Sequence, residues 1–292
     1  MSNLSQYKIR TATLNDRQRL AHLTHFEGYV HRHLDYRPAL DWLGNSPFLV
    51  LAQKDNIAGV IACPPDPPHV AWLRLFAVSK LAILEEAWAL LWKHALDEVN
   101  LIPGIECIAV IPQHRWFIEL LEQSKFQYSN SIIGFNLDES DENLFQIHKN
   151  INLRAMKAED LLEVSLIDQS AFSSIWQNSL ESLNLAFQQS SISTVALSNN
   201  KIIGYQISTL TSIGTHLARL AVLPSYQGKG VGKTLLNDLI KKSISMGAKT
   251  ISVNTQKENL ASIELYTKFG FKTTGEEFPV YIKMIRNFIQ SI

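Results

Sequence analysis

Three glycines fall within five residues in the second half of this 292-residue chain, where an apolar segment gives way to a helical pattern. Residues 224–234 read Pro-Ser-Tyr-Gln-Gly-Lys-Gly-Val-Gly-Lys-Thr. Glycine lets the backbone approach a ligand closely, and the unpaired N–H groups at the start of a helix attract an anion. Lys229 and Lys233 add positive charge. The loop therefore predicts phosphate binding, with a tight strand-to-helix turn and solvated lysines as the alternative.

Two nucleotide-binding motifs resemble this loop without matching it. A Walker A motif needs a glycine five residues before the glycine of Gly-Lys-Thr, and Gln227 stands at that position. A dinucleotide fingerprint reads G-x-G-x-x-G, whereas Gly228, Gly230 and Gly232 give G-x-G-x-G. Each motif misses by one position. A P-loop nucleotide hydrolase, which would bind ATP with magnesium, stays open as an alternative.

A tyrosine with possible acid chemistry lies further along the chain, in the stretch from Asn259 to Phe271. Apolar residues recur there at helical spacing, with Asn259 as a possible N-cap and Gly270 as the stop. A phenol has a pKa of about 10, so Tyr266 holds its proton at neutral pH and can donate it. Core packing on the same helical face is the alternative role for Tyr266.

The segments around these residues alternate between strand and helix patterns. A hairpin is predicted from 194–197 and 202–207, and a strand over 217–223 ends at Pro224. A one-faced helix is predicted from Val231 to near Gly247, and a further strand over 250–253. The alternation predicts a mixed sheet domain of the α/β (α+β) class.

The chain contains this pattern twice. Four pairs of segments correspond, the first offset by 144 residues and the other three by 145: 9–16 with 153–160, 48–59 with 193–204, 72–78 with 217–223, and 120–126 with 265–271. The acidic stretch that begins at Asp138 lacks apolar periodicity. We therefore expect a first domain over residues 1–138, a linker over 139–150 and a second domain over 151–292.

Composition excludes several classes of protein. Lys plus Arg and Asp plus Glu number 27 each, which argues against a nucleic-acid coat. Cys63 and Cys107 are too few for a disulfide framework or a thiolate zinc site. No apolar run reaches the roughly 18 residues of a membrane helix, and the first residues lack a leader pattern. We expect a cytoplasmic protein, monomer or homodimer, that binds neither nucleic acid nor membrane and holds no metal.

The motifs together resemble the GNAT superfamily of acyl-CoA N-acyltransferases. Gln227, Gly230 and Gly232 form its Q-x-x-G-x-G, and residues 220–224 look like the strand that precedes this loop in the family. Residues 259–271 match its motif N-x-x-[A/S]-x-x-L-Y-x-x-x-G-F. The resemblance implies two tandem GNAT-like domains, each a mixed, mostly antiparallel central sheet flanked by helices.

The resemblance also implies a co-substrate, acetyl-CoA, and a direct attack by a primary amine of a small molecule or peptide. The loop 227–233 would hold the pyrophosphate, the amides of Leu220 and Val222 would bind the pantetheine arm, and Tyr266 would be the general acid. The residues implied at the cofactor are Leu220, Ala221, Val222, Gln227, Gly228, Lys229, Gly230, Val231, Gly232, Lys233, Asn254, Asn259 and Tyr266. A CoA-binding sensor or scaffold without turnover is the alternative function.

The general base and the acceptor site are less well defined by the motifs. Ribosomal-protein alanine acetyltransferases carry a glutamate where this chain has Asn254, which cannot act as a base. His216 is our candidate base, directly or through water. Phe172 and Trp176 are candidates to line the acceptor site, with core packing as the alternative. Asp168, Glu181, Glu258 and a chain of waters are further candidates for the base.

The first copy lacks the glycine loop of residues 227–233. The offset of 145 places Ala82, Glu85 and Ala87 at the positions of Gln227, Gly230 and Gly232, and Leu121 at that of Tyr266. Carboxylates at Glu85 and Glu86 would repel a pyrophosphate. We expect the first copy not to bind CoA in the usual way, and to pack against the active domain and shape its acceptor site.

Overall fold

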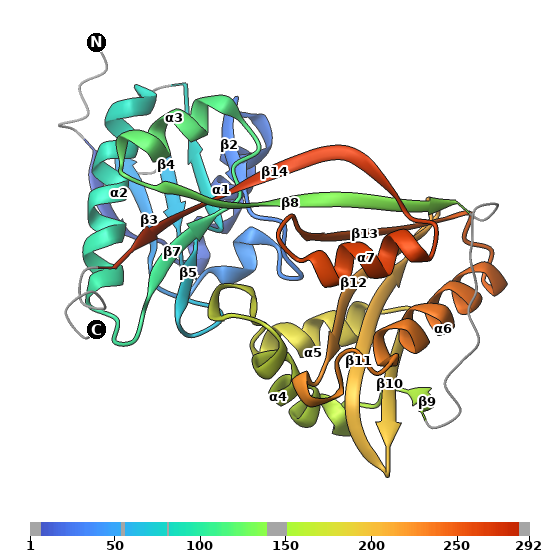
Figure 1. Ribbon diagram of the computed structural model, residues 1–292. Helices are drawn as coiled ribbons and strands as arrows, with labels where there is room; N and C mark the ends of the chain where they lie inside the picture. Colours follow the sequence, from blue (N-terminus) through green and yellow to red (C-terminus); the bar gives the residue numbers. More distant parts are fainter. Residues whose placement is uncertain (1–6, 54–55, 81, 139–150, 286–292) are drawn as a thin grey trace. The chain divides into compact units, whose positions relative to one another are not determined.

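The computed structural model describes residues 7–53, 56–80, 82–138 and 151–285 (Figure 1). Two compact units are present: a first unit of the residues up to Ser129 together with those from Pro279, and a second unit of Asn130–Phe278. We predicted domains over 1–138 and 151–292, so each unit takes the end of a strand that the repeat assigns to the other copy. The predicted linker, 139–150, lies outside the described residues.

Elements of the first copy follow the predicted order of hairpin, strand, helix, strand and helix; a strand, a helix and another strand precede them, and a final strand follows them. They are β1 (Lys8–Thr11), a 3₁₀-helix (Leu14–Asp16), α1 (Arg17–Phe26), β2 (Tyr29–Arg32), a 3₁₀-helix (Ala39–Trp42), β3 (Phe48–Gln53), β4 (Asn56–Ala62), β5 (Val70–Trp72), β6 (Leu75–Val78), α2 (Leu84–Asn100), β7 (Cys107–Val110), α3 (Arg115–Gln123) and β8 (Gln127–Asp138).

Elements of the second copy repeat this order, except that a second helix follows the first and no strand of the described residues corresponds to β2. They are β9 (Asn152–Ala155), a 3₁₀-helix (Ala158–Asp160), α4 (Leu161–Ala171), a 3₁₀-helix (Ser174–Trp176), α5 (Leu180–Gln189), β10 (Ile192–Ser198), β11 (Lys201–Leu210), β12 (Thr215–Val222), a 3₁₀-helix (Pro224–Tyr226), α6 (Val231–Ser245), β13 (Thr250–Gln256), α7 (Leu260–Lys268) and β14 (Lys272–Met284).

The sheet of the second unit is mixed and mostly antiparallel, as predicted. Its strand order is β9-β10-β11-β12-β13-β8, with β14 beside β8, and only β12 and β13 run parallel. Asn199 and Asn200 take left-handed backbone conformations, which suit the tight turn of the β10–β11 hairpin. Gly204 faces α6 and Tyr205 faces Asp168 of α4, so these two helices cover opposite faces of the sheet.

The first unit builds its main sheet in the order β1-β3-β4-β6-β2. Strand β5 pairs with β7 in parallel, and Tyr281–Met284 at the end of β14 pair with β7 from the other side. Apolar side chains of β3, β4 and β6 pack under α2 and α3, where Phe76 stacks on Phe117 with ring centroids 5.6 Å apart. In the second unit, residues of β8 from Ile132 onward pair with β13, which explains why the unit boundaries depart from the repeat.

Candidate active site

The parallel strands β12 and β13 pair over only three residues each. Their partners are Thr215 with Ile251, His216 with Ser252, and Leu217 with Val253. Beyond this point β12 continues beside β11 on one side, and β13 continues beside β8 on its other side. Within the part of the chain that the structure describes, no strand pairs with this edge of β12 after Leu217. An open strand edge is therefore available to an extended ligand.

Backbone N–H groups of Leu220 and Val222 point to this open edge. The N–H of Leu223 donates to the carbonyl oxygen of Ile203 in β11 at 2.9 Å. Because successive N–H groups of a strand point to opposite sides, those of Val222 and Leu220 are directed away from β11. The side-chain amide of Gln227 donates to the Val222 carbonyl at 3.1 Å and ties the glycine loop to the strand.

The glycine loop connects β12 to the start of α6. Gly228 and Gly230 have φ angles of +73° and +84°, which side chains rarely adopt, and Gly230 is the N-cap of α6. Val231 is buried beneath the loop, and the Lys229 ammonium lies 5.2 Å from the centre of the Tyr226 ring. The first N–H groups of α6 have no partner within the helix, so the loop presents a positive helix end.

Gly232 brings three elements together at the first turn of α6. A Cβ atom at this position would lie 3.5 Å from Leu265 of α7 and 3.9 Å from both Leu220 and Val222 of β12. The predicted cofactor residues of the loop and of the strand are therefore neighbours in space, and Leu265 of α7 lies beside them.

Tyr266 lies on α7, with a side chain that is only 5% exposed. Its ring packs against Phe135 and Phe271, with centroids 6.1 and 5.6 Å away. Burial raises the pKa of Tyr266 to about 12, opposed by a hydrogen bond with the Ser262 side chain. The phenol therefore keeps its proton at neutral pH. The Asn259 side chain caps α7 by accepting the Ser262 N–H at 3.1 Å.

His216 lies beside the point where β12 and β13 stop pairing. Its Nδ1 is 2.9 Å from the hydroxyl oxygen of Ser252, its partner residue across the strands. Burial lowers the pKa of His216 below the usual 6.5, so the ring is neutral at pH 7. Leu217 packs in the cluster that holds Tyr266, so His216, the preceding residue, lies on the opposite face of the sheet. Asn254, on β13, is exposed.

Asp168 and Arg219 form a buried ion pair that the sequence did not reveal. Arg219 donates to both carboxylate oxygens, from Nε at 2.7 Å and from Nη2 at 2.8 Å. The carboxylate also accepts hydrogen bonds from the Tyr205 hydroxyl and, at 2.8 Å, from the Asn178 N–H. Asp168 is fully buried, and these four donors make it a poor general base.

Phe172 and Trp176, the predicted acceptor residues, belong to the segment that Arg219 holds. The guanidinium carbon lies 3.6 Å from the centre of the Phe172 ring, and Nη2 donates to the Trp176 carbonyl at 2.6 Å. Both residues are therefore attached to β12 next to Leu220. The motifs did not indicate a role for Arg219, because its partner Asp168 lies 51 positions away in the chain.

Comparison with known proteins identifies the family of a large part of the second copy. Residues 161–271 match the family model described as the acetyltransferase (GNAT) family. These residues are a GNAT acetyltransferase domain. The chain is 39% identical over 75 residues to the [ribosomal protein bS18]-alanine N-acetyltransferase of Haemophilus influenzae, covering 26% of this chain and 51% of that protein. It is 33% identical over 67 residues to the uncharacterized N-acetyltransferase YvbK of Bacillus subtilis, covering 23% of this chain and 43% of that protein. The chain thus spans about half the length, or less, of these relatives.

Solved structures extend the likeness to the first copy. A tandem GNAT protein from the clavulanic acid biosynthesis pathway superposes with a TM-score of 0.66 at 11% identity, covering 96% of this chain and 98% of that one. A GCN5-related N-acetyltransferase from Anabaena variabilis gives a TM-score of 0.70 at 12% identity, covering 96% of this chain and 73% of that one. The predicted fold of tandem GNAT-like domains is therefore confirmed. No helix in the described residues is long and apolar enough to cross a membrane.

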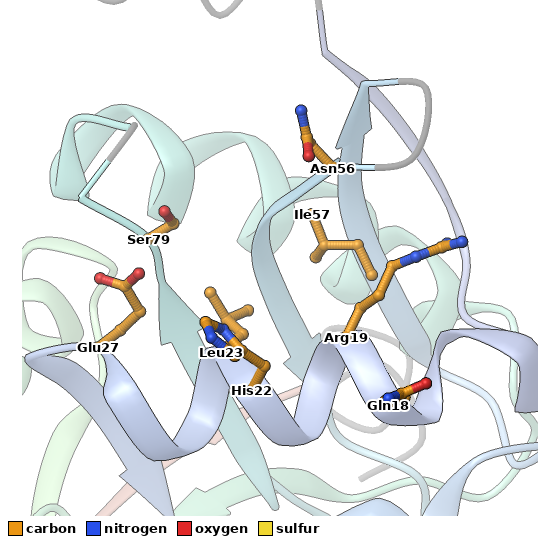
Figure 2. Close-up of a pocket in the computed structure, with 8 residues that line it drawn as sticks. All are labelled: Gln18, Arg19, His22, Leu23, Glu27, Asn56, Ile57 and Ser79. Carbon is orange, nitrogen blue, oxygen red and sulfur yellow. The ribbon is translucent and has the colours of Figure 1, made fainter.

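The first copy carries a pocket of its own along α1, with a volume of about 450 Å³. Figure 2 shows Glu27 and Ser79 toward one end of the pocket and Gln18 and Arg19 toward the other. The Lys80 N–H donates to the Glu27 carboxylate at 3.0 Å, and Arg19 lies 3.4 Å from the Asp16 carboxylate. The charged groups of this pocket thus have protein partners, and none of its residues was predicted as part of a site.

Proposed function

We propose that this protein is an acetyl-CoA-dependent N-acetyltransferase whose catalytic domain is the second copy, over residues 151–292. The acceptor we propose is a primary amine of a small molecule or a peptide. The observation that carries the proposal is the open edge of β12, with the amides of Leu220 and Val222 directed into it and the start of α6 at its end.

The residues present fit a long, extended, anionic thioester. The edge of β12 offers N–H donors to an amide-containing arm, and the loop of residues 227–233 offers a positive helix end to a pyrophosphate. Gly228 and Gly230 let the backbone approach that group closely, and Lys229 and Lys233 add charge. Acetyl-CoA would supply an activated acyl group with a thiol leaving group.

Two residues donate and accept the protons of the reaction. Tyr266 holds a proton at its hydroxyl and donates it to the leaving sulfur. His216, neutral at pH 7, accepts the proton of the amine at Nε2, while Nδ1 is engaged with Ser252. Asn254 stands where the ribosomal-protein enzymes carry a glutamate, which supports a base other than that of the bS18-alanine relatives.

Acceptor binding is proposed for the side of the sheet where Phe172 and Trp176 lie. Arg219 fixes both residues to β12, so the acceptor would enter next to the acyl group.

Calorimetry with acetyl-CoA on the full chain tests the proposal. One binding site per chain is expected, because the first copy lacks the glycine loop. Two sites would show that the first copy also binds, and absence of binding would refute the acyltransferase. Turnover with a panel of primary amines, followed by thiol release, then separates the enzyme from a CoA-binding sensor, which binds but releases no thiol.

A further inference from the structure

The segment after the first helix takes different paths in the two copies. In the first copy it forms β2, which pairs antiparallel with β6 in the register Tyr29 with Val78 and His31 with Phe76. In the second copy, counting from the C-cap residue of each helix, Glu27 and Phe172, the same positions are 174–177. Residues 174–176 form a short 3₁₀-helix with Gln177 as its C-cap, and this stretch forms no strand ladder in the described structure.

Strand β2 lies on the edge of β6 that corresponds to the open edge of β12. Val78 is the partner of Gly59, as Val222 is the partner of Gly204. The Ser79 N–H donates to the Ala58 carbonyl at 2.8 Å, just as the next residue after Val222 donates across to β11. The N–H groups of Phe76 and Val78 therefore point to β2, as those of Leu220 and Val222 point to the open edge.

A strand of the protein itself thus fills, in the first copy, the place that we assign to the acetyl-CoA arm in the second. This adds a second reason, besides the missing glycines, for the first copy to lack a cofactor site. It also shows that, in the first copy, the segment after the first helix is long enough to pair along this edge. In the second copy, a contact must therefore prevent residues 174–177 from pairing with the open edge of β12.

The Asp168–Arg219 pair is the feature that holds this segment in the second copy. Arg219 donates hydrogen bonds to Asp168 of α4 and to the Trp176 carbonyl, and it makes a cation–π contact with the Phe172 ring. Asp168 accepts a hydrogen bond from the Asn178 N–H. Arg219, on β12, therefore holds Phe172 and Trp176, and Asp168, on α4, holds the far end of the segment at Asn178. Strand pairing along the edge would require the Trp176 carbonyl to leave Arg219.

We propose that Asp168 and Arg219 are positioning residues that hold residues 172–178 off the open edge of β12 and so keep that edge accessible to acetyl-CoA. This inference rests on the proposed function. Loss of the ion pair allows residues 174–177 to add to β12 as β2 adds to β6, and the added strand competes with the cofactor arm for the amides of Leu220 and Val222.

The test compares acetyl-CoA affinity by calorimetry in full-chain variants. Arg219→Gln breaks the pair, and the double variant Asp168→Asn with Arg219→Gln breaks it without leaving an unpaired buried charge. If the open edge remains in only a tenth of the molecules, the apparent Kd rises about tenfold. Asp160→Asn is the matched control, because Arg154 also binds Asp160 with two hydrogen bonds, of 2.6 and 2.8 Å, away from this edge.

Rescue by Ser174→Pro distinguishes a competing strand from simple damage. Ser174 is the first residue of its 3₁₀-helix and follows an extended residue, so proline suits the held conformation. The same proline opposes strand pairing, because it lacks an N–H. Added to Arg219→Gln or to the double variant, Ser174→Pro should restore the wild-type Kd, and alone it should leave the Kd unchanged.

Two results would overturn the inference: wild-type affinity in folded variants of the ion pair, or a loss of affinity that Ser174→Pro does not recover. Hydrogen exchange of the Leu220 and Val222 amides gives a readout without cofactor. These amides should exchange quickly in the wild type and slowly in the ion-pair variants. If the wild type fails to bind acetyl-CoA, the proposed function is wrong, but the exchange experiment still decides whether the segment moves.

Discussion

Gly204 lies directly opposite Val222 across β11 and β12, and a Cβ at Gly204 would come within 2.9 Å of the Ala221 carbonyl oxygen and 3.1 Å of Val231. Gly59 occupies the same place opposite Val78 in the first copy. In the second copy this glycine lets α6 pack closely on the sheet and brings its first turn to the end of β12.

Gly204→Ala should therefore destabilise the protein. The carbonyl oxygen belongs to the backbone and cannot move cheaply, so overpacking should cost about 1–3 kcal/mol of unfolding free energy. Urea denaturation measures this loss. Gly28→Ala is the control, because a Cβ there meets no heavy atom within 4 Å. Equal stability of Gly204→Ala and the wild type would show that α6 does not pack as described.

Gly230→Glu should abolish acetyl-CoA binding. It places a carboxylate at the N-cap of α6, where it repels a pyrophosphate, and it strains a backbone with φ of +84°. Calorimetry measures the loss. Gly275→Glu, at another left-handed glycine with φ of +80°, controls for backbone strain and for added charge and should bind normally. Unchanged affinity in Gly230→Glu would place the cofactor elsewhere.

Tyr266→Phe should slow turnover without weakening acetyl-CoA binding. General acid catalysis typically contributes 10²- to 10⁴-fold, roughly the expected loss in kcat with any amine that the enzyme accepts. Because the pKa of Tyr266 is raised to about 12, its deprotonation should not limit the rate near pH 9. The measurement is thiol release in steady state beside calorimetry. Unaltered kcat would assign Tyr266 to core packing alone.

His31 should make the first copy sensitive to acid. Burial lowers the pKa of His31 to about 4, although the Leu73 carbonyl bonded to the ring opposes this shift. The unfolded chain then binds more protons between the usual pKa of about 6.5 and about 4, so unfolding free energy falls as pH falls through this range, by about 3 kcal/mol in full.

Denaturation of His31→Gln at pH 7 and pH 4 measures this contribution. Glutamine can still donate to the Leu73 carbonyl but does not titrate, so the pH dependence should become shallower. The exposed His25, changed to glutamine, should leave the dependence as in the wild type. A slope that His31→Gln does not alter would assign the acid sensitivity to other groups.

Local sequence patterns were enough to predict the repeat, the hairpin, the glycine loop and the helix that carries Tyr266. Turns and helix starts depend on residues close together in the chain, such as Gly228 and Gly230, whose backbone conformations glycine alone adopts readily. The spacing of the loop and of the Asn259 motif likewise identified the family, because these segments carry their chemistry within a few residues.

Tertiary structure alone decided three features. The pairing of β12 with β13 stops after Leu217, which depends on which neighbour each strand finds. Strand β2 pairs with β6, whereas its counterpart, residues 174–177, forms no strand ladder with β12 in the described structure. The bond between Asp168 and Arg219 joins residues 51 positions apart, and its burial against Phe172 and Tyr205 arises only when α4 packs on the sheet. Contacts between distant segments are set by packing, which local residue patterns do not encode.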